Sequence, residues 1–220
     1  MDERLSMAGW ARRSPWQGVL DCSLQGSGLA ITPLDHKPLI HVAINPGDRA
    51  AFAATIRDIF GMALPSRPRR IVSGELELSW AGVCQWNFSY EHHEEGQAVC
   101  GRLAEVATLT DLSASRARLQ ISGQPAPKLL AKGCPIDLHP SVFGPNDVAV
   151  TLIAHIGVHL SQLDDTPIYE IALFRSLAGS FFSWLSEAAQ EFEIKGPSPK
   201  LEPQGAPKAG LPLGNPHAHG

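Results

Sequence analysis

Three residues in one loop have the side chains of a nucleophilic catalytic set. Cys134, Asp137 and His139 supply a thiol, a carboxylate and an imidazole. A thiol becomes a nucleophile when a neighbouring base takes its proton, and a carboxylate can orient that base. Working triads are assembled from segments that converge in space, however, and Pro135 and Pro140 flank these residues. We therefore interpret the stretch as a rigid, shaped turn.

A histidine pair further along could bind a metal ion. His155 and His159 would share one face of either a strand or a helix, so both secondary structures permit a two-histidine site. The sequence shows no third ligand. The surrounding run alternates and is rich in β-branched residues, which favours histidines that point outward from a sheet.

The other histidine pairs are weaker metal candidates. His92 and His93 precede two glutamates and are typical of a solvated helix start, because the H-E-x-x-H motif needs a second histidine after the glutamate. His217 and His219 close the chain in a polar stretch without the preformed geometry of a site. We predict no metal ligand, no cofactor ligand and no catalytic residue.

Cofactor and redox motifs are equally sparse. Gly26-Ser27-Gly28 lacks the third glycine and the following helix of a dinucleotide fingerprint, and no P-loop is present. The cysteines form no C-x-x-C pair, and we predict that all are free thiols, as expected in a reducing cytoplasm. They are Cys22, Cys84, Cys100 and Cys134.

The composition of the chain argues against several classes of function. The 220 residues are 44% hydrophobic, enough for one sizeable core or two small ones, and carry a formal net charge of -4. A chain with this net charge lacks the excess of positive charge that binds the phosphate backbone of a nucleic acid. The N-terminus lacks the apolar region of a secretory signal, and no window approaches the roughly 18 apolar residues of a membrane span. The sequence predicts a cytoplasmic protein with neither nucleic acid nor membrane as a partner.

The first folded unit is predicted over residues 38–112. Its strands and helices follow from alternation, helical spacing and turn residues. They are a strand over 39–45, a helix over 49–60, a hairpin of 75–80 with 85–90, a helix from 94, and a strand over 108–112. This βαββαβ order matches the ferredoxin-like split βαβ unit.

A second unit is predicted over residues 113–194. It has strands over 116–122, 148–155, 157–162 and 168–174, a short helix over 125–132, and a long terminal helix capped by Ser176. The fold class is therefore α+β, with two ferredoxin-like or βαβ-type units whose sheets are antiparallel or mixed.

The two ends are predicted to lie outside these units. Residues 1–37 read as an extended arm with room for one strand, and the Pro/Gly-rich residues 195–220 as a disordered tail. We expect Trp10 and Trp16 on the arm to contact partners, so that deleting residues 1–30 would weaken assembly and leave the isolated fold intact. We expect the other aromatic residues to fill the hydrophobic cores, and the alternative is that they contact a partner. They are Trp80, Trp86, Phe88, Tyr90 and Trp184.

Two stretches together resemble one family. Trp80 to Trp86 (WAGVCQW) is similar to a W-x-G-x-x-x-W hairpin of sarcosine oxidase gamma subunits, and Thr110 to Phe143, with its GCPIDLHP loop, is similar to the characteristic segment of that family. Phe174-Arg175-Ser176 resembles the closing segment of the family. The resemblance covers residues 38–192.

This resemblance implies a fold, partners and a reaction. The fold would be that of the folate-binding aminomethyltransferase of glycine cleavage. The chain would be a non-catalytic subunit with an assembly role, beside alpha, beta and delta subunits that hold FAD, covalent FMN, NAD, zinc and tetrahydrofolate. The complex would demethylate sarcosine to glycine, yielding hydrogen peroxide and either formaldehyde or 5,10-methylenetetrahydrofolate.

Other functions stay open at this point. The chain could be a stand-alone folate-binding or aminomethyltransferase-like protein, a subunit of a related N-methyl amine oxidase, or a metal- or thiol-dependent hydrolase. Many relatives carry acidic residues in the Trp-to-Trp hairpin, where this sequence has Val83, Cys84 and Gln85. A folate-type carboxylate contact is therefore not expected in that hairpin.

Overall fold

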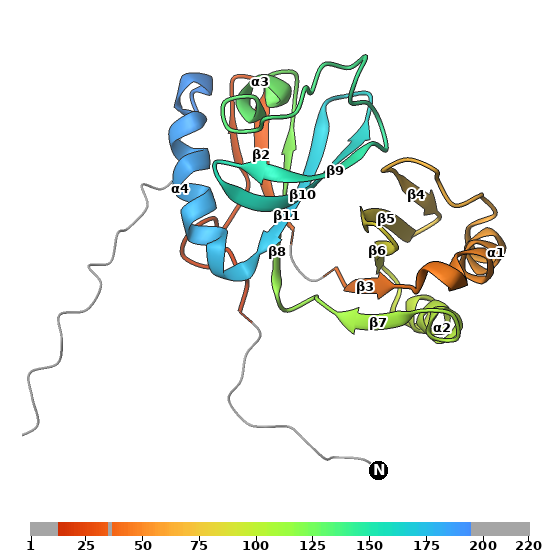
Figure 1. The fold of residues 1–220 in the computed structure, drawn as a ribbon. Coiled ribbons are helices and arrows are strands. Elements are labelled where there is room, and N and C mark those ends of the chain that lie inside the picture. Colours follow the sequence, from red (N-terminus) through yellow and green to blue (C-terminus); the bar gives the residue numbers. More distant parts are fainter. Residues whose placement is uncertain (1–12, 35–36, 195–220) are drawn as a thin grey trace, which may run out of the picture.

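The computed structural model describes residues 13–34 and 37–194. The chain forms two antiparallel sheets, one of six strands and one of five (Figure 1). Trp10, the predicted tail of residues 195–220 and its two histidines lie outside the described residues. No helix in the described part is long and apolar enough to cross a bilayer.

The five-stranded sheet is built from the predicted first unit. Its strands are β3 (Leu39–Ala43), β4 (Arg70–Ser73), β5 (Leu76–Gly82), β6 (Gln85–Tyr90) and β7 (Thr108–Asp111), and its helices are α1 (Arg49–Phe60) and α2 (His93–Ala104). The order β5-β6-β3-β7 is the ferredoxin-like split βαβ order, which confirms the prediction for this unit. Edge strand β4 is an addition to this order and was not predicted from the sequence.

The residues on either side of helix α1 determine where it begins and where it ends. A 3₁₀ turn at Pro46–Asp48 leads into it, and Gly61 ends it in the left-handed region at φ 66°. The Gly61 N–H donates to the Arg57 carbonyl at 2.9 Å. Glycine suits this position because it reaches positive φ without a steric cost.

The six-stranded sheet differs from the prediction in its strand order. It contains β1 (Leu24–Gly26), β2 (Leu29–Leu34), β8 (Arg116–Ser122), β9 (Val148–Ile153), β10 (Ile156–Asp164) and β11 (Ile168–Phe174), with helices α3 (Ala126–Leu130) and α4 (Ala178–Ala188). Strands β9, β10 and β11 form a meander whose last strand pairs with β8. A ferredoxin-like unit would instead place β10 beside β8, so only the first unit has that topology.

The N-terminal segment is part of this sheet, which corrects the extended arm that we expected. Strands β1 and β2 form a hairpin, and β2 pairs with β8. Trp16 is fully buried, and its Nε1 donates a hydrogen bond to the Arg118 carbonyl at 2.7 Å. The segment is folded because β8 offers an edge, and Trp16 is a core residue rather than a surface residue available to a partner.

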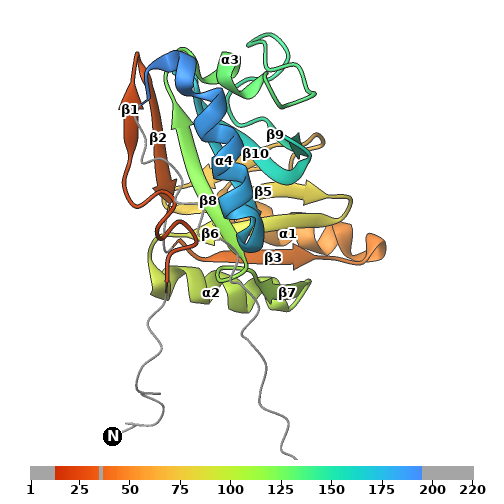
Figure 2. The ribbon, with the colours of Figure 1, turned by 90° about the vertical axis from the view of Figure 1, so that its left-hand side faces the viewer.

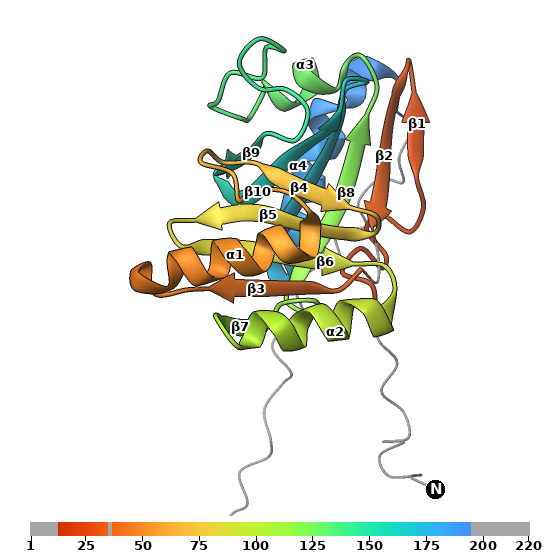
Figure 3. The same ribbon diagram turned by 90° about the vertical axis from the view of Figure 1, so that its right-hand side faces the viewer.

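The molecule has four layers. Helix α4 covers the outer face of the six-stranded sheet, and α1 with α2 covers the outer face of the five-stranded sheet (Figures 2 and 3). Each hydrophobic core lies between a sheet and its own helices: Phe52 and Ile56 of α1 belong to one core, and Phe181 and Leu185 of α4 to the other. The inner faces of the two sheets therefore meet each other without a shared hydrophobic core.

The buried aromatic residues and the free cysteines agree with the predictions, whereas the start of α4 does not. Trp86, Phe88 and Tyr90 of β6 are buried in the core beneath α1 and α2, as the alternation indicated. All four cysteines are free. Ser176 does not cap α4, because a 3₁₀ turn at Arg175–Leu177 precedes the helix and no side chain caps it.

Candidate functional site

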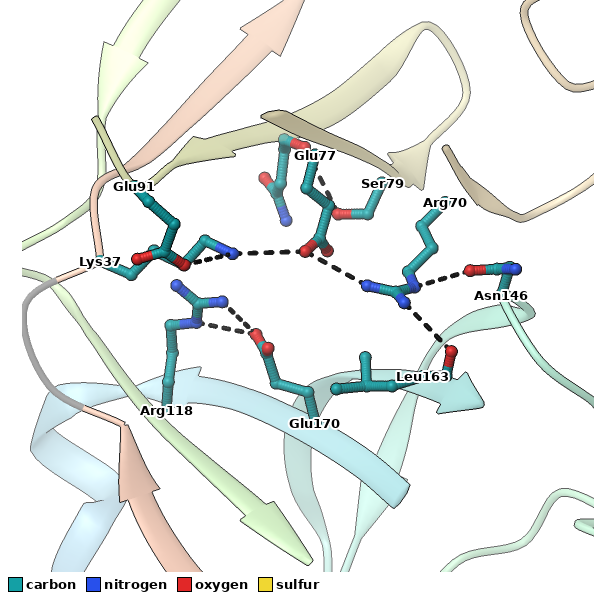
Figure 4. Close-up of polar contacts among 10 residues, drawn as sticks. Lys37, Arg70, Glu77, Ser79, Glu91, Arg118, Asn146, Leu163 and Glu170 are labelled. Carbon is teal, nitrogen blue, oxygen red and sulfur yellow. Dashed lines mark hydrogen bonds and ion pairs between the residues drawn. The ribbon is translucent and has the colours of Figure 1, made fainter. Parts of the chain in front are cut away.

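The inner faces of the two sheets form a polar layer, which is the most distinctive feature of the molecule (Figure 4). Successive strand residues point to opposite faces, so the neighbours of core residues face inward between the sheets. In β5, Leu76 and Leu78 enter a core, whereas Glu77 and Ser79 lie on the other face and are also buried. The second sheet buries these polar residues.

One half of this layer is an ion pair on the six-stranded sheet. The Arg118 guanidinium donates from Nε and Nη2 to one carboxylate oxygen of Glu170, with an Nε–oxygen distance of 2.8 Å. Arg118 is 6% exposed and the Glu170 side chain 15%. Burial by itself would raise the pKa of Glu170, but the charge and hydrogen bonds of Arg118 outweigh it and lower that pKa. Glu170 is therefore ionised at neutral pH.

The other half is centred on Glu77 of the five-stranded sheet. Its carboxylate lies 3.3 Å from Arg70 Nη1 and 3.6 Å from Lys37 Nζ. Arg70 also donates from Nε to Asn146 Oδ1 at 2.9 Å and from Nη2 to the Leu163 carbonyl at 3.1 Å. Because Arg70 belongs to β4 and Leu163 to β10, this guanidinium ties the two sheets together.

A histidine forms a second hydrogen bond between the sheets. His159 of β10 has its Nε2 2.8 Å from the Trp80 carbonyl of β5. Burial lowers the pKa of His159, despite that bond and the nearby Glu170 and Glu77, so the ring is neutral at pH 7. It points away from its own core, as expected, but the facing sheet covers it.

His155 does not join His159 on a strand face. It lies with Ala154 in the two-residue turn between β9 and β10, and both residues have left-handed φ angles, 50° and 65°. His155 is exposed. In the described part of the chain, no group of three or more His, Cys, Asp or Glu side chains is placed to hold a metal ion.

The Cys134 loop has the shaped turn that we expected. Asp137 Oδ1 accepts a hydrogen bond from the His139 backbone N–H at 2.9 Å, and His139 Nδ1 lies 2.7 Å from Ser141 Oγ. Cys134 is 7% exposed, and burial raises the pKa of its thiol. Within the described residues no hydrogen bond links this thiol to His139, so the three side chains are not arranged as a nucleophile, base and orienting acid.

A cavity of ≈ 250 Å³ is lined by residues of both sheets. Arg116 of β8 lines it, with its guanidinium carbon 3.8 Å from the centre of the Phe174 ring. Burial lowers the pKa of Arg116, and its Nη1 atom has no hydrogen-bond partner. Arg116 was not among the predicted site residues, although the alternating run RARLQIS places it on the same face as Arg118.

Comparison with known proteins identifies the protein family of this chain. The model of the family described as "Sarcosine oxidase, gamma subunit family" matches residues 45–191. The chain belongs to this family. Gamma subunits of sarcosine oxidase from Corynebacterium sp. strain P-1 and from an Arthrobacter species are 32% and 31% identical to it, and each alignment covers 82% of this chain and 91% of the relative. The resemblance found in the sequence is thus confirmed.

Solved structures agree with membership of the sarcosine oxidase gamma subunit family. A chain of the heterotetrameric sarcosine oxidase from Corynebacterium sp. U-96, solved with pyrrole 2-carboxylate, matches with a TM-score of 0.69 and 26% identity, over 85% of this chain and 99% of that one. Aminomethyltransferase T of the glycine cleavage system from Bartonella henselae matches with a TM-score of 0.51 and 16% identity, over 73% of this chain and 46% of that one. The second match shows the fold alone and confirms the predicted aminomethyltransferase-like fold.

Proposed function

We propose that this chain is a non-catalytic subunit of a heterotetrameric sarcosine oxidase and that its role is structural. The observation that carries the proposal is the match to 99% of one chain of such a complex, at a TM-score of 0.69. The alignments with gamma subunits, which cover 91% of the two relatives described above, support the same role.

The proposed reaction belongs to the whole complex. Alpha, beta and delta subunits in the cytoplasm would demethylate sarcosine to glycine, with FAD, covalent FMN, NAD, zinc and tetrahydrofolate bound outside this chain. Two features support a role without chemistry of its own. Arg118, Glu170, Glu77 and Arg70 are engaged with one another or with backbone, and the Cys134 thiol is buried with a raised pKa.

Two alternatives predict different behaviour. A stand-alone folate-binding or aminomethyltransferase-like protein is favoured by the likeness to aminomethyltransferase T, and it would bind tetrahydrofolate saturably without partners. A subunit of a related N-methyl amine oxidase would assemble in the same way but would oxidise another amine.

The partner contact is proposed for Trp10. Trp16 is occupied in the core, so a variant at Trp16 would test stability rather than assembly. Trp10 lies outside the described residues, and large aromatic residues are frequent anchors at interfaces. Trp10→Ala should weaken assembly and leave the unfolding temperature of the isolated chain unchanged. Met62→Ala, at a residue that is 39% exposed after α1, is the matched control.

The experiment is co-expression of the full chain with candidate alpha, beta and delta subunits, followed by purification through a tag on this chain. The visible spectrum and sarcosine-dependent peroxide formation are then recorded. A yellow, active complex that fails to assemble without this chain is the expected result. A colourless chain that leaves the partners behind and binds tetrahydrofolate would overturn the proposal in favour of the first alternative.

A further inference from the structure

The cavity between the sheets contains an uncompensated positive charge. Arg116 is the charged side chain among its lining residues, and no carboxylate of the described residues lines it. Apart from stacking on Phe174, the Arg116 side chain makes no ion pair or hydrogen bond within the described part of the chain. A partly buried cation without a counter-charge is unfavourable, and an anion placed beside it would remove that cost.

Polar side chains surround this charge. His41 Nδ1 lies 3.2 Å from Asn87 Oδ1, and in that orientation the Asn87 amide nitrogen is left to donate a further hydrogen bond. Asn87, Gln85 and His159 all line the cavity. His159 is neutral because burial lowers its pKa, so it adds no second positive charge at neutral pH.

The remaining wall is apolar. Leu39 comes from the five-stranded sheet, and Val150, Ala172 and Phe174 come from the six-stranded sheet. The volume of ≈ 250 Å³ lies below the range of about 300–1,000 Å³ typical of drug-sized ligands, so the cavity suits a small molecule. One cation, the amide donors of Asn87 and Gln85 and an apolar wall match a ligand with one negative charge and a short hydrocarbon part.

We propose that this cavity binds a small organic carboxylate through Arg116. The planar guanidinium can donate two parallel hydrogen bonds to the two oxygens of a carboxylate. A phosphate dianion fits less well, because a single arginine would leave one negative charge uncompensated between the sheets. This binding site is independent of the assembly role proposed above.

The test is a calorimetric titration of the purified full chain with benzoate, with benzamide as the uncharged analogue and inorganic phosphate as the competing anion. Benzoate should bind saturably with one site, and benzamide should not. Arg116→Gln should weaken benzoate binding at least tenfold, whereas Arg57→Gln, on the exposed surface of α1, should leave it unchanged.

A second variant tests the cavity itself without touching the charge. Gly157 lines the cavity, and a Cβ atom at this position would meet no atom within 4 Å. Gly157→Val should keep the fold and Arg116 but reduce the space, and benzoate binding should weaken. Equal benzoate affinity in the wild-type chain and the Arg116→Gln variant would overturn the proposal. So would unchanged binding by Gly157→Val, tighter binding of phosphate than of benzoate, or no saturable benzoate binding at all.

Discussion

Replacing Glu170 by glutamine should destabilise the chain by about 3 kcal/mol, because it leaves the Arg118 charge buried without a counter-charge. Removing one partner of a buried ion pair typically costs roughly 3–5 kcal/mol. We expect the lower end of that range, since the glutamine oxygen can still accept a hydrogen bond from the guanidinium. Arg118 is 6% exposed, so water cannot take over the role of the carboxylate.

The assay is urea denaturation at pH 7, followed by both tryptophan fluorescence and circular dichroism so that a single transition can be verified. Asp58→Asn is the matched control. Asp58 and Arg102 form an ion pair at 3.3 Å, but their side chains are 76% and 48% exposed. An exposed pair contributes at most about 1 kcal/mol, so the same change of charge should have little effect there.

The pH dependence gives an independent check. The folded-state pKa of Glu170 is lowered from its usual value of 4.5, so its contribution to stability is present above the unfolded-state pKa. That contribution is lost as the pH falls through the lower folded-state value. The difference between wild type and Glu170→Gln should therefore shrink below about pH 4.5. A loss at pH 7 no larger than that of Asp58→Asn would refute the reasoning.

Two further predictions concern stability. Ala154 and His155 have left-handed φ angles in the β9–β10 turn, where Asn-Gly is preferred, so the double variant Ala154→Asn, His155→Gly should raise the free energy of unfolding by about 1 kcal/mol in urea denaturation. An unchanged midpoint would contradict a strained turn. Trp16→Ala should lower stability by about 3–5 kcal/mol, and Trp16→Phe by less, because the alanine variant leaves a large cavity beside the six-stranded sheet. Thermal unfolding of both variants decides this, and a wild-type midpoint for Trp16→Ala would count against a core role.

Elements with a strong local pattern could be predicted from the sequence. The alternation in β5 and β6 identified both the hairpin and the buried face of Trp86 and Phe88. The Pro46-Gly47-Asp48 turn before the helix and Gly61 after it identified α1. The family was recognised because motifs such as Thr110 to Phe143 depend on residue identity and need no three-dimensional information.

Short or long-range features could not be predicted in the same way. Strand β4 is four residues long and follows a proline-rich loop, so its pattern was too short to identify. Strand β2 pairs with β8, more than eighty residues away in the sequence, and its own run contains Pro33. Such pairing depends on which edge is free in the folded sheet. The same reason explains why the segment with Trp16 resembled an arm.

The sequence by itself determined the α+β class, the first split βαβ unit, most element positions and the family. It also determined that Glu77, Arg116, Arg118 and Glu170 lie opposite the core residues of their strands, because side chains alternate with a period of two. Only the tertiary structure decided what covers that opposite face. A polar face next to water and a polar face against a second sheet have the same sequence pattern. Pairing of β8 with β11 brings Arg118 beside Glu170, and packing of the two sheets buries these charges and leaves Arg116 in a cavity.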